Sequence, residues 1–261
     1  MSDPFKITEP TVISFSGGRT SAYMLWRVLQ ANDGLPEDAI VCFANTGKEE
    51  EATLKFVGDC EKNWGVEIKW LEYRDSDQKF ECVTFETASR SGEPFEALIR
   101  KKKYLPNVVA RFCTQELKVL TIDRYMKSIG KEDYMTMVGV RADEPRRVVK
   151  IRQQETKYCP LADDGITEKD VWDFWNKNNF DLELPKFSGA SNCDLCFLKG
   201  SNILMGLVNQ KPERVVWWAE MENVVGSKFR NDRPSYKEMM NFNRDQTRLF
   251  DDETIPCFCG D

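Results

Sequence analysis

The stretch that decides the fold is Thr11-Val12-Ile13-Ser14-Phe15-Ser16-Gly17-Gly18-Arg19-Thr20-Ser21, and an apolar run over residues 22–29 follows it. The apolar residues 11–15 predict a short buried strand, the two glycines a tight turn, and the second apolar run a helix. Such a turn gathers backbone N–H groups at a helix N-terminus, where a phosphate binds well. The spacing is not that of the P-loop, which requires a Lys. An ordinary Gly-rich turn without a ligand explains the same residues.

Outward from this turn, the alternation of strand and helix continues. Residues 39–44 and 134–140 predict buried strands, residues 66–73 an alternating strand and residues 49–62 a helix. This order predicts a doubly wound α/β fold with a mainly parallel sheet. Polar residues follow three of the strands, at 16–21, 45–47 and 141–147, and strand carboxyl ends bind ligands in such sheets. We therefore expect one ligand site there, with residues 1–150 as the nucleotide-binding α/β core and residues 151–261 as a smaller C-terminal helical and loop lobe that carries cysteines.

Charge and hydropathy narrow the class of protein. The 261 residues include 37 Lys and Arg against 43 Asp and Glu, a net charge of -6. This balance disfavours a large nucleic-acid footprint. No apolar run approaches the roughly 20 residues that span a bilayer, and the first ten residues do not resemble a signal peptide. We therefore expect a cytoplasmic protein without a membrane partner.

The chain has nine Cys and no His. The absence of His excludes a Ser-His-Asp triad and metal sites with His ligands. Cys193 and Cys196 form a C-x-x-C in a polar loop, a spacing that suits one metal ion or cluster and also a redox dithiol. The loop setting favours a metal, and four sulfurs are then the natural ligand set. Cys42 and Cys60 fall in predicted core segments and are interpreted as core thiols.

Basic residues occur in two settings. The run at 100–103 is interpreted as a solvated face. Arg141, Arg146 and Arg147 instead follow a predicted strand end, where guanidinium groups bind phosphate or sulfate in a bidentate manner.

Taken together, these segments resemble the phosphoadenosine phosphosulfate (PAPS) reductase family of the adenine nucleotide alpha-hydrolase-like superfamily. The resemblance covers about residues 11–200 and depends on an ordered set of motifs. These are residues 14–21, Asn45-Thr46-Gly47, Cys113-x-x-x-x-Lys118-Val119-Leu120, Gly139-Val140-Arg141, Cys159-Pro160-Leu161-Ala162-Asp163, Asp170-Val171-Trp172 and Cys193-x-x-Cys196.

The resemblance implies that an adenine nucleotide (PAPS, APS or ATP) lies on the Gly-rich turn. Asn45 stands where the family has Asp, and Arg141 resembles a family arginine near the phosphate or sulfate. The implied nucleotide-binding residues are Ser14, Ser16, Gly17, Gly18, Arg19, Thr20, Ser21, Phe43, Asn45, Thr46, Gly47, Arg141, Arg146 and Arg147.

Several family members carry a [4Fe-4S] cluster, held by a Cys-Cys pair and a later C-x-x-C. Here Phe112 replaces one cysteine of the pair, so the resemblance implies Cys113, Cys193 and Cys196 as ligands, with Cys257 of the tail as the fourth. The family also uses a C-terminal Glu-Cys-Gly-x-His thiol as its nucleophile. The tail here keeps Cys259-Gly260 but lacks the Glu and the His. Cys259 is thus the predicted nucleophile, and an exchange of roles with Cys257 stays open.

The activity that the resemblance implies is that of an iron–sulfur PAPS or APS reductase, with Cys259, Arg141 and Lys118 as catalytic residues. A thiolate attacks the sulfate sulfur, and a thioredoxin-like reductant then releases sulfite. Two alternatives are an ATP-dependent sulfurtransferase that thiolates a nucleic acid, and a nucleotide-binding regulator without catalysis. In ATP-cleaving relatives the turn reads Ser-Gly-Gly-x-Asp-Ser and its Asp helps to bind magnesium. Thr20 occupies that position here, and a hydroxyl is a poorer Mg²⁺ ligand than a carboxylate.

Overall fold

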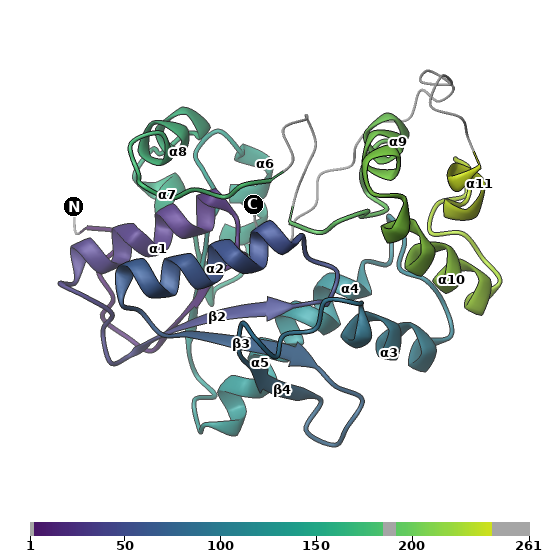
Figure 1. Cartoon of the computed structure of the whole chain (residues 1–261). Coiled ribbons are helices and arrows are strands. Elements are labelled where there is room, and N and C mark those ends of the chain that lie inside the picture. The colour runs from purple at the N-terminus through teal and green to yellow at the C-terminus, as the bar shows by residue number, and fades with distance from the viewer. Residues whose placement is uncertain (1–2, 185–191, 242–261) are drawn as a thin grey trace.

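A six-stranded sheet with the order β4-β3-β2-β1-β5-β6 forms the centre of the computed structural model, which describes residues 3–184 and 192–241 (Figure 1). All neighbouring strands are parallel except β4, which is antiparallel to β3. The doubly wound, mainly parallel α/β prediction is confirmed; the short edge strands β4 and β6 were not predicted. The strands are β1 (Thr11–Ser14), β2 (Ala39–Asn45), β3 (Ile68–Tyr73), β4 (Phe80–Val83), β5 (Met135–Val138) and β6 (Lys157–Tyr158).

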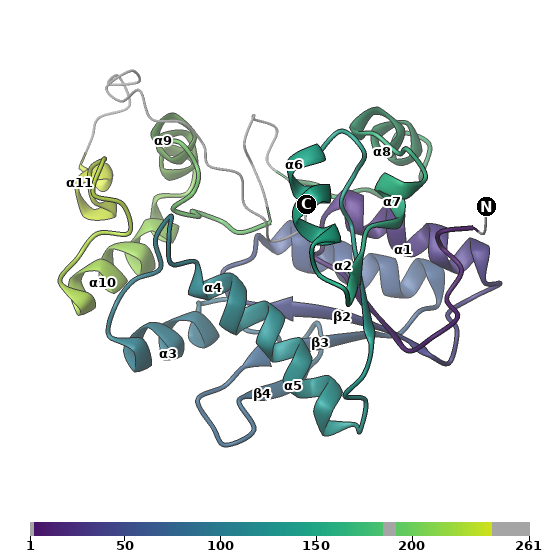
Figure 2. The ribbon, with the colours of Figure 1, turned by 180° about the vertical axis from the view of Figure 1, so that it is seen from behind.

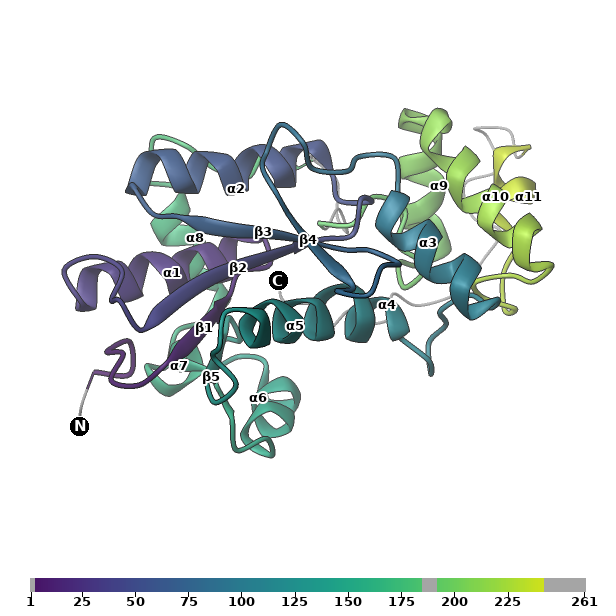
Figure 3. The same ribbon diagram turned by 90° about the horizontal axis from the view of Figure 1, so that it is seen from below.

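Helices cover both faces of the sheet because successive strand residues point to opposite faces. On one face, Ile13, Phe43 and Met137 pack in a core formed with α1 (Arg19–Ala31), α2 (Glu51–Trp64) and α8 (Glu168–Trp175). On the other face, Val12 and Cys42 pack against α5 (Leu120–Ser128). Seen from below, α2 and α5 lie on opposite sides of the strands (Figure 3).

The chain after residue 150 first returns to this sheet. β6 pairs with β5, and α8 packs on α1 through Val171 and Trp175. Thr167 and Asp170 form a capping box at the N-terminus of α8. Two short helices complete this part, α6 (Pro145–Arg152) and α7 (Pro160–Asp163).

A second hydrophobic core lies beyond the end of β2, among helices seen on the left of Figure 2. Trp218 and Tyr236 are buried there and stack on each other. A 3-10 turn (Pro212–Arg214) leads directly into α10. The helices of this core are α3 (Glu93–Lys102), α9 (Ser201–Gln210), α10 (Val215–Val225) and α11 (Tyr236–Met240).

Two further short elements join the cores. α4 (Phe112–Thr114) continues into a π-helical turn, η1 (Gln115–Val119), and then into α5. The segment after β2 meets the cysteine loop, residues 192–200, through an antiparallel bridge between Glu49 and Cys193. Within the described ranges, no helix combines the length and the apolar character that a membrane span requires.

Candidate nucleotide site and cysteine loop

The Gly-rich turn connects β1 to the N-terminus of α1. Gly17 has a φ of +78°, and a Cβ atom there would lie 2.7 Å from Cγ2 of Thr53, so only glycine fits. The Oγ atoms of Ser16 and Ser21 lie 2.9 Å apart, and Ser21 Oγ also accepts the N–H of Ser16 at 3.2 Å. These contacts close the turn around the first helical amides, as a phosphate site requires.

A cavity of about 840 Å³ opens beside this turn. Ser14, Ser16 and Ser21 line it from β1 and the turn, Gly139 from the end of β5, and Lys118 from η1. A Cβ atom at residue 139 would lie 3.0 Å from Cα of Ser21, so the missing side chain lets β5 approach α1. The cavity extends along the sheet from the carboxyl ends of β1 and β5, where α/β sheets bind ligands, to the amino ends of the same strands at Pro10 and Met135.

Arg141 reaches the turn from the end of β5. Its Nη1 donates to Oγ1 of Thr20 at 3.2 Å, and its Nε pairs with Asp143 Oδ1 at 2.9 Å. Burial alone would raise the pKa of Asp143, but hydrogen bonds from the N–H of Glu168 and from Arg141 hold it below its usual value. The guanidinium of Arg141 thus contacts Thr20, the residue that stands in place of the Asp of a Ser-Gly-Gly-x-Asp-Ser turn.

The other predicted arginines differ in their placement. Arg147 is buried and forms an ion pair with Glu144, whereas Arg146 is exposed on α6. Arg19 makes a bidentate contact to Asp181, with N–O distances of 2.7 and 2.8 Å, and its guanidinium lies over the ring of Trp172. Arg19 therefore anchors the chain near residue 181 to the turn.

Asn45, at the end of β2, is fully buried. Its Nδ2 donates to Glu72 Oε1 at 2.6 Å and to the carbonyl of Ser89 at 2.8 Å, and its Oδ1 accepts the N–H of Gly47 at 3.0 Å. Phe43, on the same strand, is also fully buried. Neither residue lines the cavity: Phe43 packs in the core with α1 and α2, and Asn45 holds the loop after β2.

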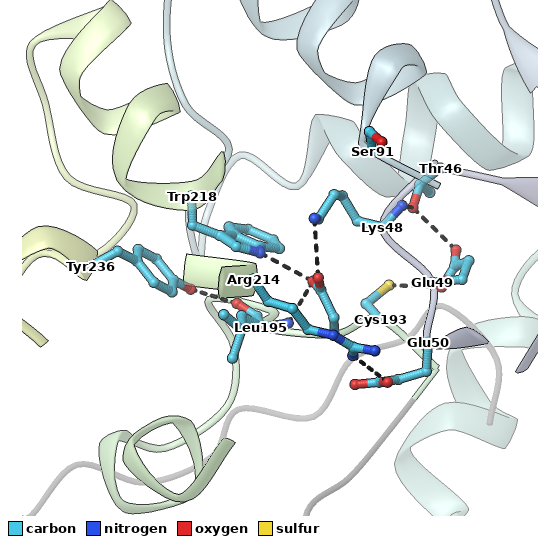
Figure 4. A network of polar contacts seen from close by, with 12 residues as sticks. Thr46, Lys48, Glu49, Glu50, Ser91, Cys193, Leu195, Arg214, Trp218 and Tyr236 are labelled. Carbon is cyan, nitrogen blue, oxygen red and sulfur yellow. Dashed lines mark hydrogen bonds and ion pairs between the residues drawn. The ribbon is translucent and has the colours of Figure 1, made fainter. Parts of the chain in front are cut away.

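A chain of contacts joins the cavity to the cysteine loop through Glu49. Lys118, which lines the cavity, pairs with Glu49 Oε1 at 3.2 Å, and the Cys193 thiol donates to Glu49 Oε2 at 3.2 Å. Thr46 also donates to Glu49 (Figure 4). Glu49 was not predicted as a site residue; its one signal in the sequence is its place just after the strand-end Asn-Thr-Gly segment. The π turn that carries Lys118 is a local irregularity typical of functional sites.

A buried ion pair holds the same loop one residue further on. Lys48 Nζ lies 3.1 Å from Asp194 Oδ2, and Trp218 Nε1 donates to Asp194 Oδ1 at 3.0 Å (Figure 4). Burial raises the pKa of Asp194, although Lys48 acts in the opposite direction. Asp194 lies between Cys193 and Cys196, so this pair fixes the C-x-x-C against the segment after β2.

The cysteines divide into core and site groups. Cys42 and Cys60 are fully buried, as predicted, and burial raises the pKa of both thiols. Cys113 and Cys196 border the second core, and Cys193 contacts Glu49. Within residues 3–184 and 192–241, no three Cys, Asp or Glu side chains are grouped closely enough to hold a metal ion. Residues 257 and 259, the predicted ligand and nucleophile, lie outside the described ranges.

Comparisons with known proteins agree with the motifs. The protein-family model for the phosphoadenosine phosphosulfate reductase domain matches residues 10–184. The uncharacterized nin region protein ORF290 of Escherichia phage lambda is 31% identical over 239 residues, which cover 88% of this chain and 79% of that protein. An uncharacterized protein of Methanocaldococcus jannaschii is 29% identical over 229 residues, 84% of this chain but 42% of that longer protein.

Among solved structures, the U34-tRNA thiolase NcsA from Methanococcus maripaludis with its [4Fe-4S] cluster aligns with a TM-score of 0.42 and 15% identity. This alignment covers 100% of this chain and 82% of the thiolase. The family model spans well over half of the 261 residues and includes the Gly-rich turn, Lys118 and Arg141. The chain therefore belongs to the phosphoadenosine phosphosulfate reductase domain family.

Proposed function

We propose that the protein binds an adenine nucleotide on its Gly-rich turn and reduces a sulfate group carried on the nucleotide phosphate, as a PAPS or APS reductase. The observation that carries this proposal is the contact between Arg141 and Thr20, 3.2 Å long, at the N-terminus of α1. A guanidinium there favours an anionic group directly, whereas the Asp of a magnesium-binding turn would favour a metal-bound triphosphate.

The chain's own residues have distinct parts in this reaction. The turn amides and the dipole of α1 hold the nucleotide phosphate. Arg141 and Lys118 supply the positive charge that stabilises the sulfate oxygens as the bond to the phosphate oxygen breaks. Glu49 holds Lys118 at the cavity through the 3.2 Å contact.

The proposed step is attack by a cysteine thiolate, with Cys259 as the predicted nucleophile. A bond forms between the cysteine sulfur and the sulfate sulfur, and the bond from that sulfur to the phosphate oxygen breaks. The nucleotide leaves with the electron pair of the broken bond. A dithiol such as a thioredoxin-like protein then reduces the S-sulfocysteine, which releases sulfite, regenerates the thiol and leaves the reductant as a disulfide.

The [4Fe-4S] cluster is a separate part of the proposal. The resemblance assigns its ligands to Cys113, Cys193, Cys196 and Cys257, but the described residues do not form a metal-binding group on their own. No step above therefore runs through a cluster. Iron and sulfide analysis after anaerobic purification tests it: about four of each per chain would support a cluster of this type, and zinc or no metal would contradict it.

The activity is tested by incubating the full chain separately with APS, PAPS and ATP in the presence of a dithiol. Sulfite and a stoichiometric amount of AMP or adenosine 3′,5′-bisphosphate support the proposal. AMP and pyrophosphate from ATP, without sulfite from either sulfonucleotide, would contradict it and favour the sulfurtransferase. Cys259→Ser should abolish sulfite release, and Cys82→Ser, at an exposed cysteine of β4, is the matched control.

A further inference from the structure

We propose that Asn192 is a positioning residue that holds the peptide between Ser16 and Gly17 with its N–H toward the nucleotide. The inference rests on the proposed function only in that an anionic group of a nucleotide binds at this turn. Asn192 precedes Cys193, so the same residue connects the nucleotide turn to the cysteine loop.

The geometry begins with one hydrogen bond between distant parts of the chain. Asn192 Nδ2 donates to the carbonyl oxygen of Ser16 at 2.9 Å, and Asn192 is 8% exposed. That carbonyl and the N–H of Gly17 belong to one peptide unit. The peptide bonds of the described ranges are all trans, and in a trans unit the C=O and N–H point in opposite directions. The Gly17 N–H therefore points away from Asn192.

Among the described residues, no acceptor takes up the Gly17 N–H. Glycine allows both orientations of the preceding peptide at little steric cost. The flipped peptide would present the Ser16 carbonyl to an anion instead of an N–H. The Asn192 amide favours the orientation that binds an anion. Flipping the peptide would break its hydrogen bond to the Ser16 carbonyl and leave the buried amide without an acceptor.

Asn192 is itself held in place by the segment after β2. Its carbonyl accepts the N–H of Glu50 at 2.6 Å, and the N–H of Asp194 donates to the carbonyl of Lys48 at 2.9 Å. The ion pair of Lys48 with Asp194 secures the same loop. The donor is thus preorganised before a nucleotide arrives, and an anion on the Gly17 N–H would polarise the peptide and strengthen the bond on its other side.

The test compares the affinities of the full chain for AMP and for adenosine, measured by titration calorimetry. The ratio of the two affinities isolates the phosphate, because loss of folded protein affects both ligands equally. Asn192→Ala should lower the affinity for AMP about tenfold and leave that for adenosine unchanged, the scale of one hydrogen bond to a charged group. Asn192→Asp, which replaces the donor by a carboxylate, should lower the ratio further.

Asn178→Ala is the matched control, since Asn178 Nδ2 also donates to a backbone carbonyl, that of Phe174 at 2.8 Å, at the end of α8. It should keep the wild-type ratio. An unchanged ratio in Asn192→Ala, with AMP binding intact in the wild type, would overturn this inference alone. A wild-type chain that binds AMP no better than adenosine would overturn it together with the proposed nucleotide site.

Discussion

Replacing Asn45 by Asp, the residue that the family carries there, should destabilise this chain in a pH-dependent way. Asn45 Nδ2 lies 2.6 Å from Glu72 Oε1, and both side chains are fully buried. The variant would place two carboxyl groups at that distance, and such a pair shares one proton. If the pKa of the new carboxyl pair rises by about three units, the cost at alkaline pH is about 4 kcal/mol, at 1.36 kcal/mol per unit.

The direction of the pH dependence follows from the linkage between protonation and folding. The folded-state pKa of the pair is raised, so the penalty is absent below the unfolded value near 4 and complete only above the folded value near 7. Urea denaturation should therefore show Asn45→Asp about 5 kcal/mol less stable than wild type at pH 8, about 4 from the carboxyl pair and about 1 from the lost hydrogen bond to Ser89. At pH 5 the loss should fall to about 2 kcal/mol, because most of the carboxyl penalty has not yet developed. Addition of Glu72→Gln should remove most of the pH dependence. Equal losses at pH 5 and pH 8 would refute the reasoning.

Three further variants test the site. Gly17→Ala should lower the free energy of unfolding in urea by about 2–4 kcal/mol, because φ is positive at this residue and the new Cβ would lie 2.7 Å from Thr53. It should also abolish AMP binding in calorimetry, and normal AMP affinity would contradict the role of the turn. Lys48→Met leaves the Asp194 carboxylate buried without its cation and raises the pKa of Asp194 further, so the unfolding free energy should fall as pH rises. Relative to wild type, the loss should be about 3 kcal/mol at pH 8 and much less at pH 5. The same loss at both pH values would argue against the ion pair. Arg141→Gln should weaken AMP binding about tenfold with little change in melting temperature, and unchanged affinity would remove Arg141 from the anion site.

Local signals in the sequence were sufficient for most of the sheet and for the turn. Hydrophobic runs predicted β1, β2, β3 and β5 to within about two residues. The edge strands β4 and β6 were not predicted because both are short; β4 has four residues and forms a hairpin with β3. β6 has two residues, too few for a periodic pattern.

The polar network around the cysteine loop could not be predicted, because its partners lie far apart in the sequence. Glu49 and Cys193 are separated by 144 residues, and Asn192 and Ser16 by 176. No local pattern distinguishes a buried Lys48–Asp194 pair from solvated charges, since burial is decided by the second core. Asn45 shows the same limit: its strand-end position was predicted, but its pairing with Glu72 depends on the register of β2 and β3.

The proposed reaction requires that a cysteine of this chain accepts the sulfonate group of a nucleotide bound at the Gly-rich turn. Intact-protein mass spectrometry after incubation with APS or PAPS, without reductant, tests it most directly. We expect one sulfonate adduct per chain on a cysteine, which a dithiol releases as sulfite. The adduct should be absent from Arg141→Gln at the same substrate concentration and time. A chain that stays unmodified while both sulfonucleotides remain intact would contradict it.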